Sequence, residues 1–130
     1  MSGYLFAYGT LQPGHAPAHM AAVAAKLRPV GEGFVRGRLY DLGGYPGAVP
    51  DTSATSRILG TVMELPEDPG LLRQLDSYEE YDPQSPETSE YVRELQRVEL
   101  TAGGALGCWF YRYNWKPDES RLIASGAWRK

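Results

Sequence analysis

The sequence has little cysteine and no concentrated positive charge. Its single cysteine, Cys108, has no partner for an internal disulfide and cannot supply a multi-cysteine zinc site. The 13 basic and 16 acidic residues give a net charge of -3, and no run of lysine or arginine is dense enough to follow a phosphate backbone. We therefore expect packing to stabilise the chain, and we expect no nucleic-acid partner.

Long hydrophobic runs are also missing. The longest aliphatic stretch, residues 20–25, is far shorter than a membrane span, and the N-terminus lacks a basic region followed by a signal-type apolar segment. These absences predict a soluble, cytoplasmic protein with no membrane partner.

Glycine and proline are abundant, with 15 and 10 copies, which is typical of strands joined by tight turns. The pattern predicts strands over residues 58–65, 91–100 and 105–113, the last two forming a hairpin. It predicts helices over residues 18–27 and from Pro69 to about Tyr78 or Glu79.

Strands outnumber helices, and the helices are not spaced as regular βαβ units. At 130 residues the chain fits one domain. We therefore predict a single α+β domain over residues 1–130, with a mixed, barrel-like β-sheet and a few flanking helices.

The run Tyr4–Leu11 is aromatic and apolar and changes character at a glycine. Its first half is typical of a buried strand, and Gly9-Thr10-Leu11 is typical of a loop at the end of that strand. Such a loop leaves backbone N–H groups to point at a ligand, so we interpret it as a candidate anion-binding edge.

A carboxylate is predicted within the apolar stripe of the second helix. At about 100° per residue, Leu75 lies about 40° from Leu71 and Glu79 about 80°, whereas Asp76 and Glu80 fall at or beyond the edge of the stripe, near water. Burial and the negative end of a helix both raise the pKa of a carboxyl group. Glu79 is therefore a candidate general base. The alternatives are that the helix ends before Glu79 and its side chain turns outward, or that the side chain forms a buried hydrogen bond with no catalytic role.

Several motifs occur in the order typical of one family. They are Tyr8-Gly9-Thr10-Leu11, the turn Gly37–Gly43 with Tyr45-Pro46, Leu75–Glu79 as an LDxxE segment, Tyr91-Val92-Arg93, Trp109-Phe110-Tyr111 and the tail Ile123–Trp128. Together they resemble the gamma-glutamylcyclotransferase-like family, in the form of its small bacterial members. Two positions depart from the pattern: Glu80 replaces a common glycine, and Ala127 replaces the usual acid of the tail.

The resemblance implies the gamma-glutamylcyclotransferase-like fold and an intramolecular acyl transfer that needs neither metal nor cofactor. A gamma-glutamyl substrate would release 5-oxoproline and an amine or amino acid. The resemblance assigns the acid/base role to Glu79, and the backbone of Gly9, Thr10 and Leu11 would hold a carboxylate or oxyanion. Tyr91 is expected near the glutamate. Tyr8 and Tyr113 are expected to wall the pocket.

Other chemistries have weaker support in the sequence. His15 and His19 are four residues apart, but Pro17 interrupts a helix between them, so we predict no metal site. Cys108 lies among aromatic residues and is interpreted as a buried structural cysteine. No GxSxG or GxxxxGK(S/T) motif is present, which argues against serine hydrolysis and P-loop chemistry.

Two alternatives to the leading interpretation stay open. One is a non-catalytic, regulatory protein that binds a small molecule in the same pocket. The other is a related reaction, such as a gamma-glutamylamine cyclotransferase or acyl transferase, selected by residues 80–89 and the Tyr45-Pro46 turn. Either would be expected as a monomer or homodimer.

Overall fold

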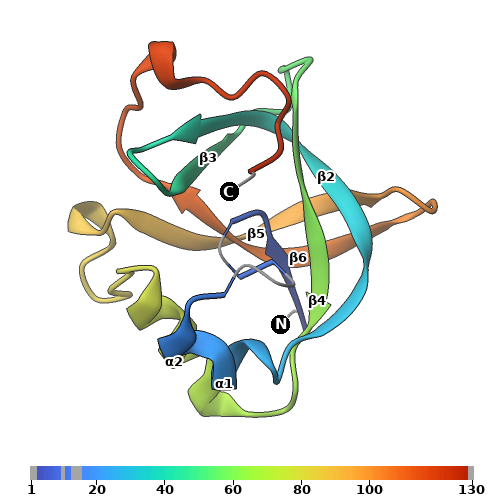
Figure 1. The fold of residues 1–130 in the computed structure, drawn as a ribbon, viewed down its shortest axis with the longest axis vertical. Coiled ribbons are helices and arrows are strands. Elements are labelled where there is room, and N and C mark those ends of the chain that lie inside the picture. Colours follow the sequence, from blue (N-terminus) through green and yellow to red (C-terminus); the bar gives the residue numbers. More distant parts are fainter. Residues whose placement is uncertain (1–2, 10, 13–15, 129–130) are drawn as a thin grey trace.

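Five strands close into a mixed barrel in the computed structural model, which describes residues 3–9, 11–12 and 16–128. The sheet order is β3-β2-β4-β1-β6-β5, and a further pairing of β2 with β5 closes the barrel, leaving β3 as an extra strand (Figure 1). The strands are β1 (Tyr4–Ala7), β2 (Arg28–Asp41), β3 (Pro46–Pro50), β4 (Arg57–Glu64), β5 (Tyr91–Leu100) and β6 (Ala105–Tyr113). The predicted α+β, barrel-like domain is confirmed.

The short strand β1 lies in the interior of this sheet. It pairs antiparallel with β4 and parallel with β6, and Leu5 faces Met63 on one side and Trp109 on the other. Leu5, Phe6 and Ala7 are all buried. A strand covered on both faces reads as a continuous apolar run, which explains the sequence of this segment.

Alternating side chains divide the core into two clusters. Phe6 belongs to a cluster with Val62 and Phe110, and its ring stacks on that of Phe110 with centroids 5.8 Å apart. Leu5 belongs to a second cluster that includes Leu71 and Leu75 of the long helix. The helix therefore packs on the opposite face of β1 from the first cluster.

The long helix α2 (Pro69–Tyr78) begins as predicted. Asp68 is its N-cap and accepts a hydrogen bond from the Gly70 backbone N–H, with Pro69 in the first turn. The helix predicted over residues 18–27 is shorter: a 3₁₀ turn (Ala18–Met20) leads into α1 (Ala21–Ala24). Pro29 disfavours helix before it, and pairing of β2 with β4 already begins at Arg28.

The β5–β6 hairpin also matches the prediction. Tyr91 pairs with Tyr113 and Glu99 with Ala105, and the tail contains one 3₁₀ turn (Glu119–Arg121). Figure 1 shows α1 and α2 at one end of the barrel and the tail near the other. Within the described residues, no helix is both long and apolar enough to cross a membrane.

Candidate active site

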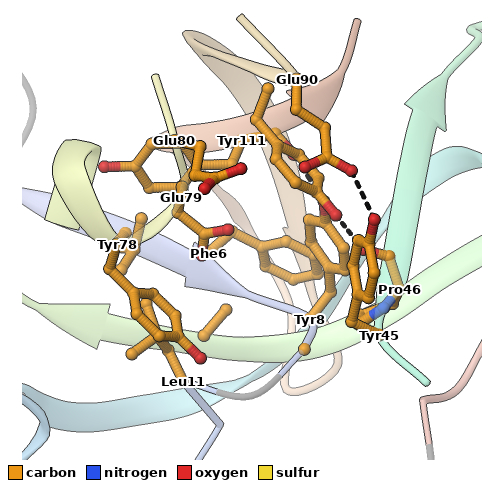
Figure 2. Close-up of a pocket in the computed structure, with 14 residues that line it drawn as sticks. Phe6, Tyr8, Leu11, Tyr45, Pro46, Tyr78, Glu79, Glu80, Glu90 and Tyr111 are labelled. Carbon is orange, nitrogen blue, oxygen red and sulfur yellow. Dashed lines mark hydrogen bonds between the residues drawn. The ribbon is translucent and has the colours of Figure 1, made fainter. Parts of the chain in front are cut away.

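A cavity of about 340 Å³ lies between the end of β1, the end of α2 and the start of β5 (Figure 2). Residues 5–9 and 11, Tyr45 and Pro46, residues 78–80, Glu90 and Tyr91, and Tyr111 line it. Its wall is therefore assembled from segments that are far apart in the sequence.

Most of the predicted site residues lie together in this cavity. Tyr8, Gly9, Leu11, Glu79 and Tyr91 all line it. Thr10, whose backbone was expected to hold an anion, lies outside the described residues.

Tyr113 is placed differently from the expectation. It does not line the cavity, and its ring packs edge-on against that of Tyr91, with centroids 5.8 Å apart. The ring is the cross-strand neighbour of Tyr91 in the hairpin. Tyr113 therefore supports a cavity residue and does not itself form the wall.

The loop after β1 is held by the side chain of Gln12. The Gln12 amide nitrogen donates to the backbone oxygens of Tyr8 and Gly9, at 3.0 and 3.2 Å. A side chain at Gly9 would place its Cβ 2.8 Å from Cγ of Pro46, so only glycine fits this approach. Among the described residues, no hydrogen bond is made by the backbone N–H groups of Gly9 and Leu11, and both residues line the cavity.

Glu79 is the C-cap of α2, and its half-buried side chain points into the cavity (Figure 2). Burial, reinforced by the carboxylates of Glu90 and Asp76, raises its pKa from 4.5 to about 8. Among the described residues, no hydrogen bond holds its carboxyl group. The group is therefore available to exchange a proton near neutral pH.

Asp76 corrects the helical-wheel prediction, which placed it near water. It is only 4% exposed, and Arg93 on β5 binds it through two hydrogen bonds of 2.7 and 3.1 Å. The Tyr111 hydroxyl donates to the same carboxylate at 2.7 Å. The wheel treats the helix in isolation, whereas α2 packs this face against the β5–β6 hairpin.

Glu80 explains why glycine is common after the glutamate. It adopts φ 55°, in the left-handed region. The helix ends there in a Schellman motif, in which the Tyr81 N–H donates to the backbone oxygen of Asp76 and the Glu80 N–H to the backbone oxygen of Ser77. A side chain in this conformation costs about 1–2 kcal/mol. The exposed Glu80 is thus accommodated with backbone strain.

Replacing Glu80 with glycine should stabilise the protein by roughly 0.5–1 kcal/mol, because relief of the left-handed strain exceeds the extra chain entropy of glycine. Urea unfolding measures the change. Glu80→Gln is the matched control, because it removes the charge but keeps the strain, and it should leave stability near that of the wild type. Equal stabilisation by both variants would instead assign the effect to charge.

Tyr45 and Glu90 form a hydrogen bond at the mouth of the cavity (Figure 2). The Tyr45 hydroxyl donates to Oε2 of Glu90 at 2.7 Å, and this bond is the main cause that raises the pKa of Tyr45 to about 12. Glu90 is a cavity residue that was not predicted from the sequence. Its one signal is its position immediately before Tyr91, whose hydroxyl donates to the Pro46 carbonyl at 2.5 Å.

Among the described lining residues, the side chains that can carry a full charge are acidic, and Glu79 holds its proton below about pH 8. Glu79, Glu80 and Glu90 line the cavity, and no lysine, arginine or histidine is among the described lining residues. Such a wall favours an ammonium group over a carboxylate near the three side chains. The backbone N–H groups after β1 are the donors left to receive an anionic group.

The competing metal and cysteine sites can now be placed. Among the described residues, no three His, Cys, Asp or Glu side chains form a cluster that could hold a metal ion. His15 lies outside the described residues, and the His19 ring packs on that of Tyr78, with centroids 5.8 Å apart. Cys108 is buried, and burial raises the pKa of its thiol to about 11, as expected for a structural cysteine.

Comparison with known proteins identifies the fold and the family. Solved structures with a similar fold include an AIG2-like protein from Mus musculus, with 21% identity, a TM-score of 0.73 and coverage of 98% of this chain and 88% of that one. An uncharacterized protein from Pyrococcus horikoshii has 20% identity and a TM-score of 0.63, with coverage of 97% and 89%. A protein described as a gamma-glutamyl cyclotransferase has 16% identity and a TM-score of 0.59, with coverage of 85% and 65%.

A search of curated protein sequences gives no match. The family model described as "Gamma-glutamyl cyclotransferase, AIG2-like" matches residues 5–130, which is nearly the whole chain. Because this match extends over nearly the whole chain, the chain belongs to the AIG2-like gamma-glutamyl cyclotransferase family.

Proposed function

We propose that the protein converts a gamma-glutamyl amide into 5-oxoproline and a free amine. The main support for this proposal is that the Glu79 carboxyl group has a pKa of about 8 and faces a cavity of about 340 Å³. A free α-amino group ordinarily titrates at about 8. A matched pKa favours proton transfer between the two groups.

In the proposed reaction the ionised Glu79 takes a proton from the substrate α-ammonium. The freed nitrogen attacks the γ-carbonyl carbon, and a five-membered ring closes through a new C–N bond. Glu79 then returns the proton to the departing nitrogen as the original amide C–N bond breaks. The regenerated Glu79 carboxylate takes the second proton from the ring nitrogen and passes it to the released amine, which leaves as an ammonium ion. Tethering of nucleophile and electrophile in one molecule supplies much of the effective concentration.

The backbone after β1 has the complementary role. The N–H groups of Gly9 and Leu11 would donate to the substrate carboxylate or to the oxygen that becomes negative during attack. The close contact between Gly9 and Pro46 fixes the path of this loop.

The reaction is tested by incubating the purified protein with a panel of gamma-glutamyl amino acids and amines and measuring 5-oxoproline by mass spectrometry. We expect product from at least one member, at a rate proportional to enzyme concentration. A folded protein that binds panel members in calorimetry but forms no product would support the non-catalytic binding protein instead.

The acidic wall predicts which leaving groups are preferred. A leaving amine that carries a second ammonium group would meet Glu90, whereas a leaving amino acid would bring a carboxylate toward it. At about 1 kcal/mol per charge pair in water, we expect kcat/KM to be roughly fivefold or more higher for the gamma-glutamyl amide of 1,4-diaminobutane than for gamma-glutamylalanine. In Glu90→Gln the ratio should fall toward one. An unchanged ratio would show that Glu90 does not select the leaving group.

A further inference from the structure

One buried ion pair lies immediately behind the candidate base. Asp76 and Arg93 have side chains that are 5% and 17% exposed, and the guanidinium holds both carboxylate oxygens. A bidentate pair of this kind fixes geometry as well as charge. It joins the last turn of α2 to the beginning of β5, near the open end of the β5–β6 hairpin.

The groups around the pair restrict it further. The Arg93 guanidinium lies over the Trp109 ring, 4.5 Å from its centroid. The Tyr111 hydroxyl donates to Asp76, and the Tyr111 backbone oxygen accepts a hydrogen bond from the Tyr8 hydroxyl at 2.6 Å. Tyr8 and Tyr111 both line the cavity, so the pair is connected to its wall.

Glu79 depends on this connection for its position. It follows Asp76 by three residues, less than one helical turn, and its own carboxyl group has no hydrogen bond among the described residues. The Tyr81 N–H also donates to the Asp76 backbone oxygen, at 2.8 Å. The end of the helix is thus held at Asp76 from both its side chain and its backbone.

We propose that the Asp76–Arg93 ion pair, with the Tyr111 hydroxyl, is a positioning unit that holds the Glu79 carboxyl group in the cavity and keeps the net charge behind it near zero. The catalytic consequence rests on the proposed function, whereas the charge balance can be tested without turnover.

The charge balance predicts that neutralising Asp76 and neutralising Arg93 shift the pKa of Glu79 in opposite directions. In Asp76→Asn an unpaired guanidinium remains near Glu79 and should lower its pKa. In Arg93→Gln an unpaired carboxylate remains, and since the Asp76 charge already raises the Glu79 pKa, that pKa should rise further. The double variant leaves neither charge and should return the pKa toward the wild-type value.

The other groups around Glu79 do not predict this pattern. Glu90 faces it from the start of β5 and keeps its charge in all variants. Glu80 lies beside it at the cavity mouth, and the cavity wall around it contains Tyr8 just after β1, Tyr91 on β5 and Tyr111 on β6. Burial raises the pKa of these three hydroxyls, so they stay neutral across the tested range.

The experiment measures the Glu79 carboxyl titration by ¹³C NMR, without substrate, in wild type, the two single variants and the double variant. Opposite shifts in the single variants and recovery in the double variant are expected. Shifts of the same sign, or none, in folded proteins would overturn the proposed charge balance.

The positioning role is tested by kinetics on the same proteins. A small misplacement of a base can cost about 100-fold, so we expect kcat to fall roughly 10- to 100-fold in Asp76→Asn, with KM within about threefold. Arg93→Lys keeps the charge but loses the bidentate contact, so it should lose kcat while the Glu79 titration stays near that of the wild type. An unchanged kcat in both folded variants would overturn the positioning role.

Two further variants separate this role from general stability. Removal of one partner from a buried ion pair is strongly destabilising, so Tyr111→Phe, which removes only one hydroxyl, provides a milder test if Asp76→Asn does not fold. It should lower kcat several-fold. Glu94→Gln breaks the Arg112–Glu94 pair on the same hairpin, a contact of 3.0 Å with about 30% exposed side chains, and should change neither titration nor kcat. If wild type turns over no gamma-glutamyl compound, the proposed function fails, while the NMR titration still tests the charge balance.

Discussion

Glu79→Gln is expected to lower kcat by about 10²–10⁴-fold, the usual contribution of a positioned general acid or base. Glutamine keeps the size and the hydrogen-bonding capacity of the side chain but cannot exchange a proton. KM should change little, because in the proposed binding mode the substrate carboxylate would contact the backbone N–H groups of Gly9 and Leu11 and not Glu79. The measurement is 5-oxoproline formation by purified wild type and variant, on the best substrate of the panel.

The pH dependence of the free energy of unfolding of the same variant provides an internal control. The pKa of Glu79 is about 8 in the folded protein and 4.5 as a free carboxyl group. Between these values the unfolded chain releases the proton that the folded protein keeps, so wild-type stability falls as pH rises from about 4.5 to 8. Glu79→Gln lacks this group and should be as stable as wild type at pH 4 but more stable at pH 8, by urea unfolding.

These two results are diagnostic together. A variant that gains stability at pH 8 and loses turnover has an intact fold and a missing proton acceptor. A variant that gains stability and retains full turnover would contradict the assignment of the base. Wild-type kcat/KM should also rise with pH up to about 8, as the carboxyl group of the free enzyme ionises.

Gly126→Ala is expected to destabilise the protein by about 2–5 kcal/mol. Gly126 has φ +73°, where a side chain costs about 1–2 kcal/mol, and a Cβ here would lie only 1.8 Å from the Arg57 backbone oxygen. The neighbouring backbone cannot move easily, because Leu59 N–H donates to the Gly126 oxygen at 2.8 Å. Chemical unfolding of wild type and variant measures the loss.

Gly104 provides the matched control for this substitution. It has φ +84° in the β5–β6 turn, and a Cβ there would meet nothing within 4 Å. Gly104→Ala should therefore lose only the strain of about 1–2 kcal/mol, and the difference between the two variants measures the clash. Equal losses would show that the tail relaxes away from Arg57. The packing of Trp128, which is 8% exposed and belongs to the core cluster of Phe6 and Phe110, would then loosen with the tail.

Local signals in the sequence were sufficient for much of the fold. Asp68 and Pro69 mark a helix start by capping chemistry, and the glycines of the β5–β6 turn mark a hairpin, because both depend on a few adjacent residues. Glu79 was found because its side chain follows Leu71 and Leu75 around the helix onto the buried face. The spacing of apolar residues along a helix predicts its buried face correctly when a single neighbouring element packs against all of those residues.

The remaining features depend on contacts between distant segments. Asp76 was predicted near water because a helical wheel contains no information about Arg93, which arrives from another strand. Glu90 was missed because its partner Tyr45 is 45 residues away. Tyr113 was expected in the wall together with Tyr8, whereas it pairs with Tyr91 in the hairpin and its ring packs on the Tyr91 ring outside the cavity lining.

The dispersed origin of the cavity wall has a consequence for assembly. Tyr8 and Tyr111 meet across a separation of 103 residues, so neither an N-terminal nor a C-terminal fragment contains a complete wall. Contacts between such distant residues form only after the intervening chain has closed its loops. During synthesis or refolding, turnover should therefore appear with the last step of barrel closure. A partly folded or proteolytically truncated chain should have no activity. An enzyme assay on this protein would report complete folding more strictly than a measurement of its secondary structure.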